Sequence, residues 1–113
     1  MDIMDIRPVD QATVIEPLRN RIDAALAVRF REDLMALIAQ GNQRLVIDLS
    51  RVDFIDSSGL GVLVSLMKAV GGSANLSICN MKDSVYSVFR LTRMDKIFTI
   101  VPTEADALAK LAP

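Results

Sequence analysis

The sequence predicts an α/β fold in which a mixed sheet of four or five strands packs against about four helices. From residue 44 onward, short apolar runs alternate with amphipathic segments of helix length, as in sheets whose strands are joined by right-handed crossovers. Before that point, two short apolar-rich runs flank Pro8-Val9-Asp10-Gln11, which indicates a hairpin and makes the sheet mixed. The 113 residues are enough for a single domain, which we expect to span 1–113.

The first three elements lie between residues 3 and 41. The hairpin strands are expected at Ile3 to Arg7 and Thr13 to Leu18, with Pro17 near a strand end or on an edge because proline lacks the ladder donor. A helix is predicted from Ala24 to Gln40, where apolar residues recur at helical spacing. Asp23 precedes it as a cap for its free N–H groups, and Gly41 follows its end.

The second half of the chain alternates regularly between strands and helices. A buried central strand is predicted at Leu45 to Leu49, followed by a connector without regular structure from Ser50 to Asp56 and by a largely buried helix that ends at Gly71-Gly72-Ser73. The remaining elements are a strand at Asn75 to Cys79, a helix at about Asp83 to Thr92, a strand at Ile97 to Val101 and a terminal helix opened by Thr103.

Composition excludes several classes of function. Thirteen basic and fourteen acidic residues give a net charge of −1 without long like-charge blocks, so we expect no direct contact with nucleic acid. The chain has no histidine, which removes imidazole zinc sites, Ser-His-Asp triads and histidine phosphorelay. The sequence offers no general base to activate a hydroxyl nucleophile, so we expect neither an enzyme nor a cofactor.

The same sequence indicates a cytoplasmic protein. Its uncharged stretches are too short to span a membrane, and its first residues lack the pattern of a signal peptide. Cys79 is the single cysteine, which suits a reducing compartment, and we predict that it is a buried apolar residue without a function of its own. Oligomeric state stays open.

The most informative segment runs from Asp56 to Leu63 as DSSGLGVL. Two hydroxyl residues stand at the start of the predicted helix, where unpaired N–H groups and the helix dipole favour an anion such as phosphate. Gly59 and Gly61 lower helix propensity, which suggests that a partner or a neighbouring backbone comes close to them. A plain helix cap with glycines for close packing is the alternative interpretation.

This octapeptide, preceded by RVDFI and LVIDLS, resembles the signature of STAS domains, and most closely that of bacterial anti-sigma factor antagonists. RIDA at 21–24, VFRLTRMDKIF at 88–98 and PTEADAL at 102–108 resemble further landmarks of that family in the same order. The resemblance implies a cytoplasmic binding protein that releases a sigma factor by binding an anti-sigma factor. That anti-sigma factor is also a serine kinase, and a serine phosphatase reverses its action.

The resemblance also implies which residues act. Ser57, directly after Asp56, matches the phosphoacceptor, and Ser58 is the rival acceptor because the two hydroxyls are adjacent. Asp23 matches an acidic position near the phosphorylation site. Partner contacts are therefore expected at the following residues: Asp23, Asp56, Ser57, Ser58, Gly59, Leu60 and Gly61.

Two departures and two alternatives accompany this resemblance. Asn20 stands where the family commonly has glycine, and Arg93-Met94 replaces a usual Gly-Leu, so either could alter the choice of partner. One alternative function is a STAS domain that serves as a fixed subunit of a larger signalling or transport assembly. The other is a receiver-like domain phosphorylated on Asp48, although an Asp48 that ends a strand or caps a turn suits the pattern better.

Overall fold

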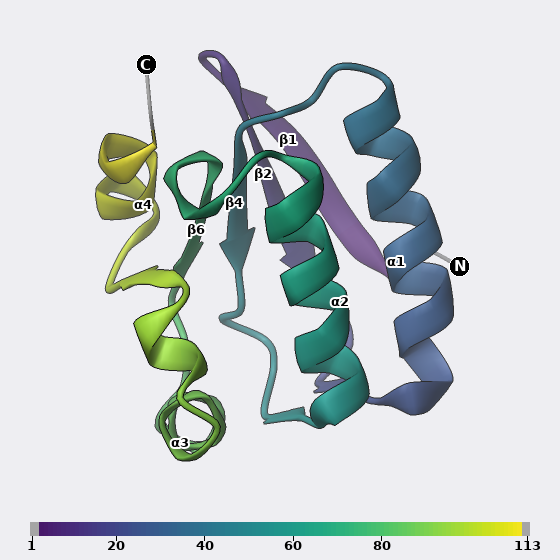
Figure 1. Cartoon of the computed structure of the whole chain (residues 1–113), viewed down its shortest axis with the longest axis vertical. Helices are drawn as coiled ribbons and strands as arrows, with labels where there is room; N and C mark the ends of the chain where they lie inside the picture. The colour runs from purple at the N-terminus through teal and green to yellow at the C-terminus, as the bar shows by residue number, and fades with distance from the viewer. Residues whose placement is uncertain (1–2, 112–113) are drawn as a thin grey trace.

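Five strands form the main sheet in the order β1-β2-β4-β6-β7 (Figure 1). The structure is a computed structural model and describes residues 3–111, so the ends of the predicted domain, 1–2 and 112–113, lie outside the described residues. The strands of this sheet are β1 (Met4–Val9), β2 (Ala12–Pro17), β4 (Leu45–Asp48), β6 (Leu76–Cys79) and β7 (Thr99–Val101). β1 and β2 are antiparallel and the other neighbours are parallel, which confirms the predicted mixed sheet.

Helices cover both faces of this sheet. The described chain has four α-helices, α1 (Ala24–Ala39), α2 (Ser57–Ala69), α3 (Asp83–Leu91) and α4 (Glu104–Lys110), and two short 3-10 turns, η1 (Ser73–Asn75) and η2 (Met94–Lys96). α1 and α2 lie side by side in front of the sheet, and α4 lies against the other face (Figure 1). Within residues 3–111, no helix is long and apolar enough to cross a membrane.

The central strand β4 shows why the sheet needs cover on both sides. Leu45 and Ile47 belong to the main core beneath α1 and α2, whereas Val46 points into a smaller core with Ala107 of α4. All three side chains are completely buried because successive residues of a strand alternate between faces. The continuous apolar run predicted as a buried central strand is therefore confirmed.

Most element boundaries agree with the sequence to within two residues. The hairpin turn is tighter than predicted: β1 continues to Val9, and Asp10 takes a left-handed conformation at φ 54°. Pro17 ends β2, as expected for a residue that cannot donate to a ladder. β7 begins two residues late, because Ile97 and Phe98 donate their N–H groups to the Met94 carbonyl and close the η2 turn.

A second, two-stranded sheet was not predicted. β3 (Arg21–Ile22) pairs in parallel with β5 (Phe54–Ile55), which lies in the connector that we expected to be irregular. The Asn20 carbonyl extends the pairing by accepting the N–H group of Asp53 at 2.8 Å. Because each strand directly precedes a helix, this pairing sets the first turns of α1 and α2 beside each other.

Asn20 and Arg93, the two departures from the family pattern, differ in the conformational strain of their backbones. Asn20 does not have a positive φ, so a side chain is accommodated there without strain. Arg93 precedes η2 in the left-handed region at φ 65° and ψ 13°, where the Cβ of an L-residue approaches the following carbonyl oxygen. Arginine at this position therefore costs stability that glycine would not.

Arg93→Gly should raise the free energy of unfolding by about 1 kcal/mol, since relief of left-handed strain outweighs the greater freedom of glycine in the unfolded chain. Asn20→Gly is the matched control and should lower it slightly, because it changes only the unfolded state. Urea denaturation of the three proteins measures both effects. An Arg93→Gly protein less stable than the wild type would contradict the strain at this position.

Candidate functional site

The N-termini of α1 and α2 meet at the carboxylate of Asp56. Asp56 Oδ1 accepts the N–H group of Gly59 at 3.0 Å and thereby caps α2. Its Oδ2 accepts the N–H group of Ala24, the first residue of α1, at 3.2 Å. Asp23 caps α1 separately by accepting the N–H group of Leu26 at 3.3 Å. One side chain thus joins the starts of two helices whose positive dipole ends converge.

Ser57 and Ser58 occupy the first two positions of α2, and both are exposed. Within residues 3–111, neither hydroxyl donates or accepts a hydrogen bond, and the N–H groups of both residues are also without a partner. These N–H groups are the unpaired donors of a first helical turn, which stabilise a nearby anion. The site therefore presents two accessible hydroxyls in a field that tolerates added negative charge.

The two glycines of the motif have different surroundings. A Cβ on Gly59 would lie 2.6 Å from the carbonyl oxygen of Ile22 and 2.7 Å from Cγ1 of Ile55. The sequence predicted a close neighbour at Gly59, and that neighbour is the β3–β5 pair of the same chain. At Gly59 this agrees with the alternative interpretation, in which glycine allows close packing. A Cβ on Gly61 would meet nothing within 4 Å, and this residue is exposed.

The seven residues predicted to contact a partner divide by burial. Ser57, Ser58 and Gly61 are exposed, while Asp23 and Asp56 are half-buried caps. Gly59 is buried against β3, and Leu60 belongs to the main core with only 7% of its surface exposed. The structure therefore brings all seven together around two helix starts, but Gly59 and Leu60 support the surface from beneath it.

We call the exposed residues near the starts of these two helices, Ala24, Ala25, Ser57, Ser58 and Gly61, the switch surface. Their side chains are small, which allows close approach of another molecule. Beside it, the Arg21 guanidinium lies 4.1 Å from the centre of the Phe54 ring and 3.6 Å from Asp23. A shallow groove of about 300 Å³ adjoins the first turn of α1, and its lining is Arg19, Asn20, Arg21, Asp23, Ala25 and Leu26.

A pair of alanine substitutions separates the roles of the two glycines. Gly59→Ala should lower the free energy of unfolding by about 1–3 kcal/mol, because its methyl group overlaps the Ile22 carbonyl. Gly61→Ala should raise it by roughly 0.5–1 kcal/mol, because alanine has the higher helix propensity and space is available. Chemical denaturation gives both values, and equal effects at the two positions would contradict the packing described.

A sequence model of the STAS domain matches residues 5–107. The chain belongs to the STAS domain family. Among its relatives, BtrV of Bordetella bronchiseptica is 30% identical over 97 residues, which is 85% of this chain and 84% of BtrV. The anti-sigma-F factor antagonist RsfB of Mycobacterium tuberculosis is 31% identical over 89 residues, or 79% of this chain and 73% of RsfB.

Solved structures of anti-sigma factor antagonists have a similar fold. An anti-sigma factor antagonist from Mycobacterium paratuberculosis superposes with a TM-score of 0.85 at 28% identity, covering 96% of this chain and 92% of that one. Unphosphorylated SpoIIAA, another anti-sigma factor antagonist, gives a TM-score of 0.77 at 23% identity over 95% and 94% of the two chains. At that identity, the second likeness concerns the fold alone.

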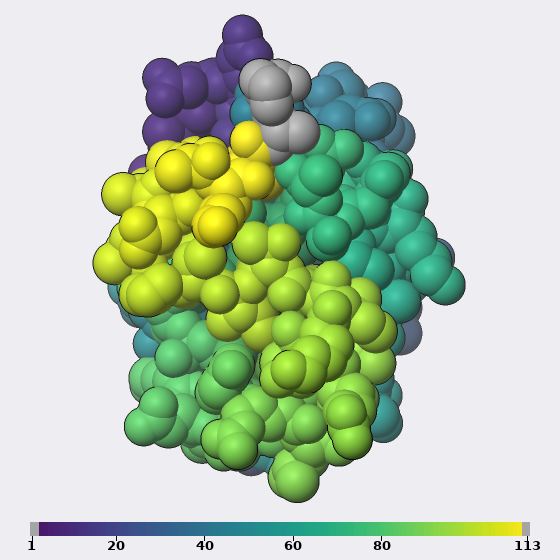
Figure 2. All heavy atoms as spheres, turned by 60° about the vertical axis from the view of Figure 1, so that its left-hand side comes forward, coloured from purple at the N-terminus to yellow at the C-terminus, as the bar shows by residue number. Residues whose placement is uncertain are grey.

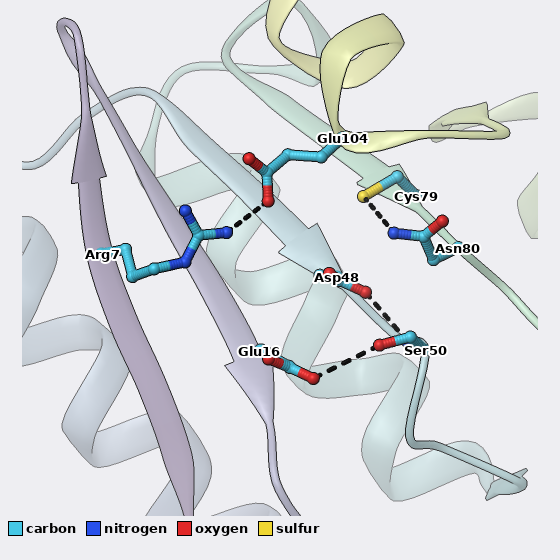
Figure 3. A network of polar contacts seen from close by, with 7 residues as sticks. All are labelled: Arg7, Glu16, Asp48, Ser50, Cys79, Asn80 and Glu104. Carbon is cyan, nitrogen blue, oxygen red and sulfur yellow. Dashed lines mark hydrogen bonds and ion pairs between the residues drawn. The ribbon is translucent and has the colours of Figure 1, made fainter.

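The alternative acceptor Asp48 lies elsewhere in this STAS domain, on the face of the sheet that α4 partly covers (Figure 3). Its Oδ1 accepts the Ser50 N–H group at 3.0 Å, so it caps the turn after β4 as predicted. The Ser50 hydroxyl in turn donates to Glu16 at 3.3 Å. Nearby, Arg7 pairs with Glu104, whose hydrogen bond and charge raise the pKa of the guanidinium. These contacts join β1 to α4, and β2 to the turn after β4.

Cys79 ends β6 on the same face and is completely buried, as predicted. Asn80 Nδ2 donates a weak hydrogen bond to its Sγ at 3.7 Å. Burial raises the pKa of the Cys79 thiol to about 12, and the carboxylates of Asp48 and Glu104 add to the effect. The thiol is therefore protonated and unreactive near neutral pH.

Cys79 should resist iodoacetamide at about pH 8 in the native protein and react only when urea unfolds the chain, because the thiolate is the nucleophile. As the pH rises, the thiol of the unfolded chain, whose pKa is 9.0, ionises before the thiol of the folded protein. Stability should consequently fall as the pH rises above about 9, and Cys79→Ala should remove that part of the decline. Mass spectrometry and urea melts measure these results; rapid native labelling would contradict them.

Proposed function

We propose that this STAS domain is an anti-sigma factor antagonist that binds an anti-sigma factor when Ser57 is unphosphorylated and so releases a sigma factor. The observation that carries the proposal is the exposed Ser57 hydroxyl at the first turn of α2, next to the carboxylate that joins α2 to α1. Relatives that bear the name anti-sigma factor antagonist support it. In this proposal the anti-sigma factor is also the serine kinase, and a serine phosphatase resets the switch.

Phosphorylation of Ser57 would change the switch surface more than the fold. It adds about −1.5 to −2 charges and three acceptor oxygens. The unpaired N–H groups of the first turn and the α2 dipole would offset part of that charge, so α2 should persist. The Ser57 hydroxyl makes no hydrogen bond within residues 3–111, so the fold does not depend on it.

Binding should be affected for two reasons. The small residues Ala24, Ala25 and Gly61 allow a partner to come close to Ser57, so a phosphoryl group would occupy space needed by that partner. Its charge would also repel acidic groups or bound nucleotide phosphates across the interface. The half-buried carboxylates of Asp56 and Asp23 increase the negative charge close to Ser57. An accessible switch residue of this kind favours regulated binding over a fixed structural subunit.

Ser57→Ala should fold, bind the anti-sigma factor as the wild type does and resist phosphorylation. Ser57→Asp should fold but bind at least about tenfold more weakly, because a permanent carboxylate takes the place of the phosphoryl group. Incubation with candidate anti-sigma kinases and ATP, followed by mass spectrometry, locates the acceptor, and calorimetry measures affinity.

Ser58→Ala is the matched control, since both hydroxyls are exposed at the same helix start. It should be phosphorylated at the wild-type rate. Undiminished phosphorylation of Ser57→Ala would overturn the assignment and point to Ser58. Tight binding by Ser57→Asp would overturn the proposed switch.

A further inference from the structure

Residues 90–97 are the end of α3 and the segment that leads from it through η2 towards β7, and this part of the chain lies on the face shown in Figure 2. The buried rings of Phe89 and Phe98 flank it and pack edge to face, with centroids 5.8 Å apart. Its two ends are therefore held together by the core, as in compact surface loops that frequently have a function. We call residues 90–97 the protrusion below.

Backbone hydrogen bonds fix the shape of the protrusion. The Arg93 N–H group donates to the Arg90 carbonyl at 3.1 Å, and the Lys96 N–H group donates to the Arg93 carbonyl at 3.2 Å. Arg93 joins these two turns in its left-handed conformation. A strained residue held in place by its surroundings is a reason to look for a function at that residue.

The side chains of the protrusion combine apolar surface with positive charge. Leu91 is 85% exposed, the highest value among the large hydrophobic residues that the structure describes, and Ile97 is 43% exposed. Arg90, Arg93 and Lys96 are all exposed, and none of them pairs with a carboxylate within residues 3–111. A hollow of about 320 Å³ next to Leu91 is lined by Ser87, Arg90 and Leu91.

The protrusion is locally basic, although the chain as a whole is nearly neutral. The protrusion carries three basic residues and the single acid Asp95, while the whole chain has a net charge of −1. It therefore complements a surface on which acidic side chains surround an apolar one. Anionic membranes are a poorer fit, because surface-bound proteins use a continuous apolar helix face or clusters of about 4–8 basic residues.

The protrusion lies within reach of a partner that covers the switch surface. Lys82 Nζ lies 2.5 Å from Asp53 Oδ1, and the Ser84 hydroxyl donates to the Asp53 carbonyl at 3.0 Å, which ties the start of α3 to β5. The nine residues of α3 extend about 13 Å from that point. A typical interface of about 800 Å² per partner measures roughly 30 Å across.

We propose that the protrusion is a second contact site for the same anti-sigma factor and that Leu91 and Arg93 determine partner specificity there by binding an acidic, partly apolar patch. This inference rests on the proposed function. Unlike the Ser57 switch, the contact at the protrusion does not depend on phosphorylation. The protrusion should therefore determine which anti-sigma factor binds, while Ser57 determines when binding occurs.

Calorimetry with the anti-sigma kinase that phosphorylates Ser57 tests the inference at about 150 mM salt, where long-range attraction is screened. Leu91→Ser and Arg93→Glu should each weaken binding about tenfold, as expected when an apolar anchor or a paired charge of an interface is lost. Arg93→Gly should weaken it several-fold despite its greater stability, which separates loss of charge from loss of fold. Ile6→Ser on β1 and Lys110→Glu on α4, exposed positions on other elements, are matched controls and should bind within twofold of wild type.

Each outcome has a distinct meaning. Restoration of Arg93→Glu binding by an acid-to-arginine substitution in the kinase would identify the acidic patch directly. Wild-type binding by Leu91→Ser and Arg93→Glu would overturn the inference and leave the Ser57 switch intact. Capture of the wild type, but not Leu91→Ser, by phosphatidylserine vesicles with unchanged kinase affinity would also overturn it. Failure of the wild type to bind any anti-sigma kinase would overturn the proposed function, and this inference with it.

Discussion

The hydrogen bonds of the Asp56 carboxylate determine how the candidate site is built. A helix start leaves N–H groups without partners, and here one carboxylate satisfies a group from α2 and a group from α1 at the same time. The two helices therefore begin from a common point, although Ala24 and Asp56 are 32 positions apart in the sequence. Ser57 takes its position from that arrangement, so its hydroxyl projects from a fixed surface.

Close packing beneath Asp56 makes these hydrogen bonds possible. β3 and β5 pair through only two residues each, and two-residue strands have little stability of their own. Gly59 lets α2 lie directly against the Ile22 carbonyl, a contact that any side chain would prevent. The glycine therefore acts within the protein: it lets the first turn of α2 rest on β3 and keeps the N–H group of Gly59 within reach of its cap.

The sequence was most informative where a regular pattern repeated. The apolar period of α1, the buried run of β4 and the caps at Asp23 and Thr103 each involve neighbouring residues, and the structure confirms them. β3, β5 and the contact between Asp56 and Ala24 depend on residues distant in the chain, which no local pattern records. The surface or core location of Gly59 and Gly61 was likewise not predictable, because helical spacing alone does not show what packs against each position.

Charge in this protein acts locally. A net charge of −1 provides little long-range attraction, so neither the switch surface nor the protrusion can depend on the field of the whole molecule. At physiological salt, interactions between exposed charges decay over about 8 Å. A phosphoryl group on Ser57 would therefore act mainly on groups that touch the first turns of α1 and α2, and the cations at the far end of α3 would keep their own environment. In the two proposals, Ser57 and the protrusion therefore act through separate local contacts, the first on the timing of binding and the second on specificity.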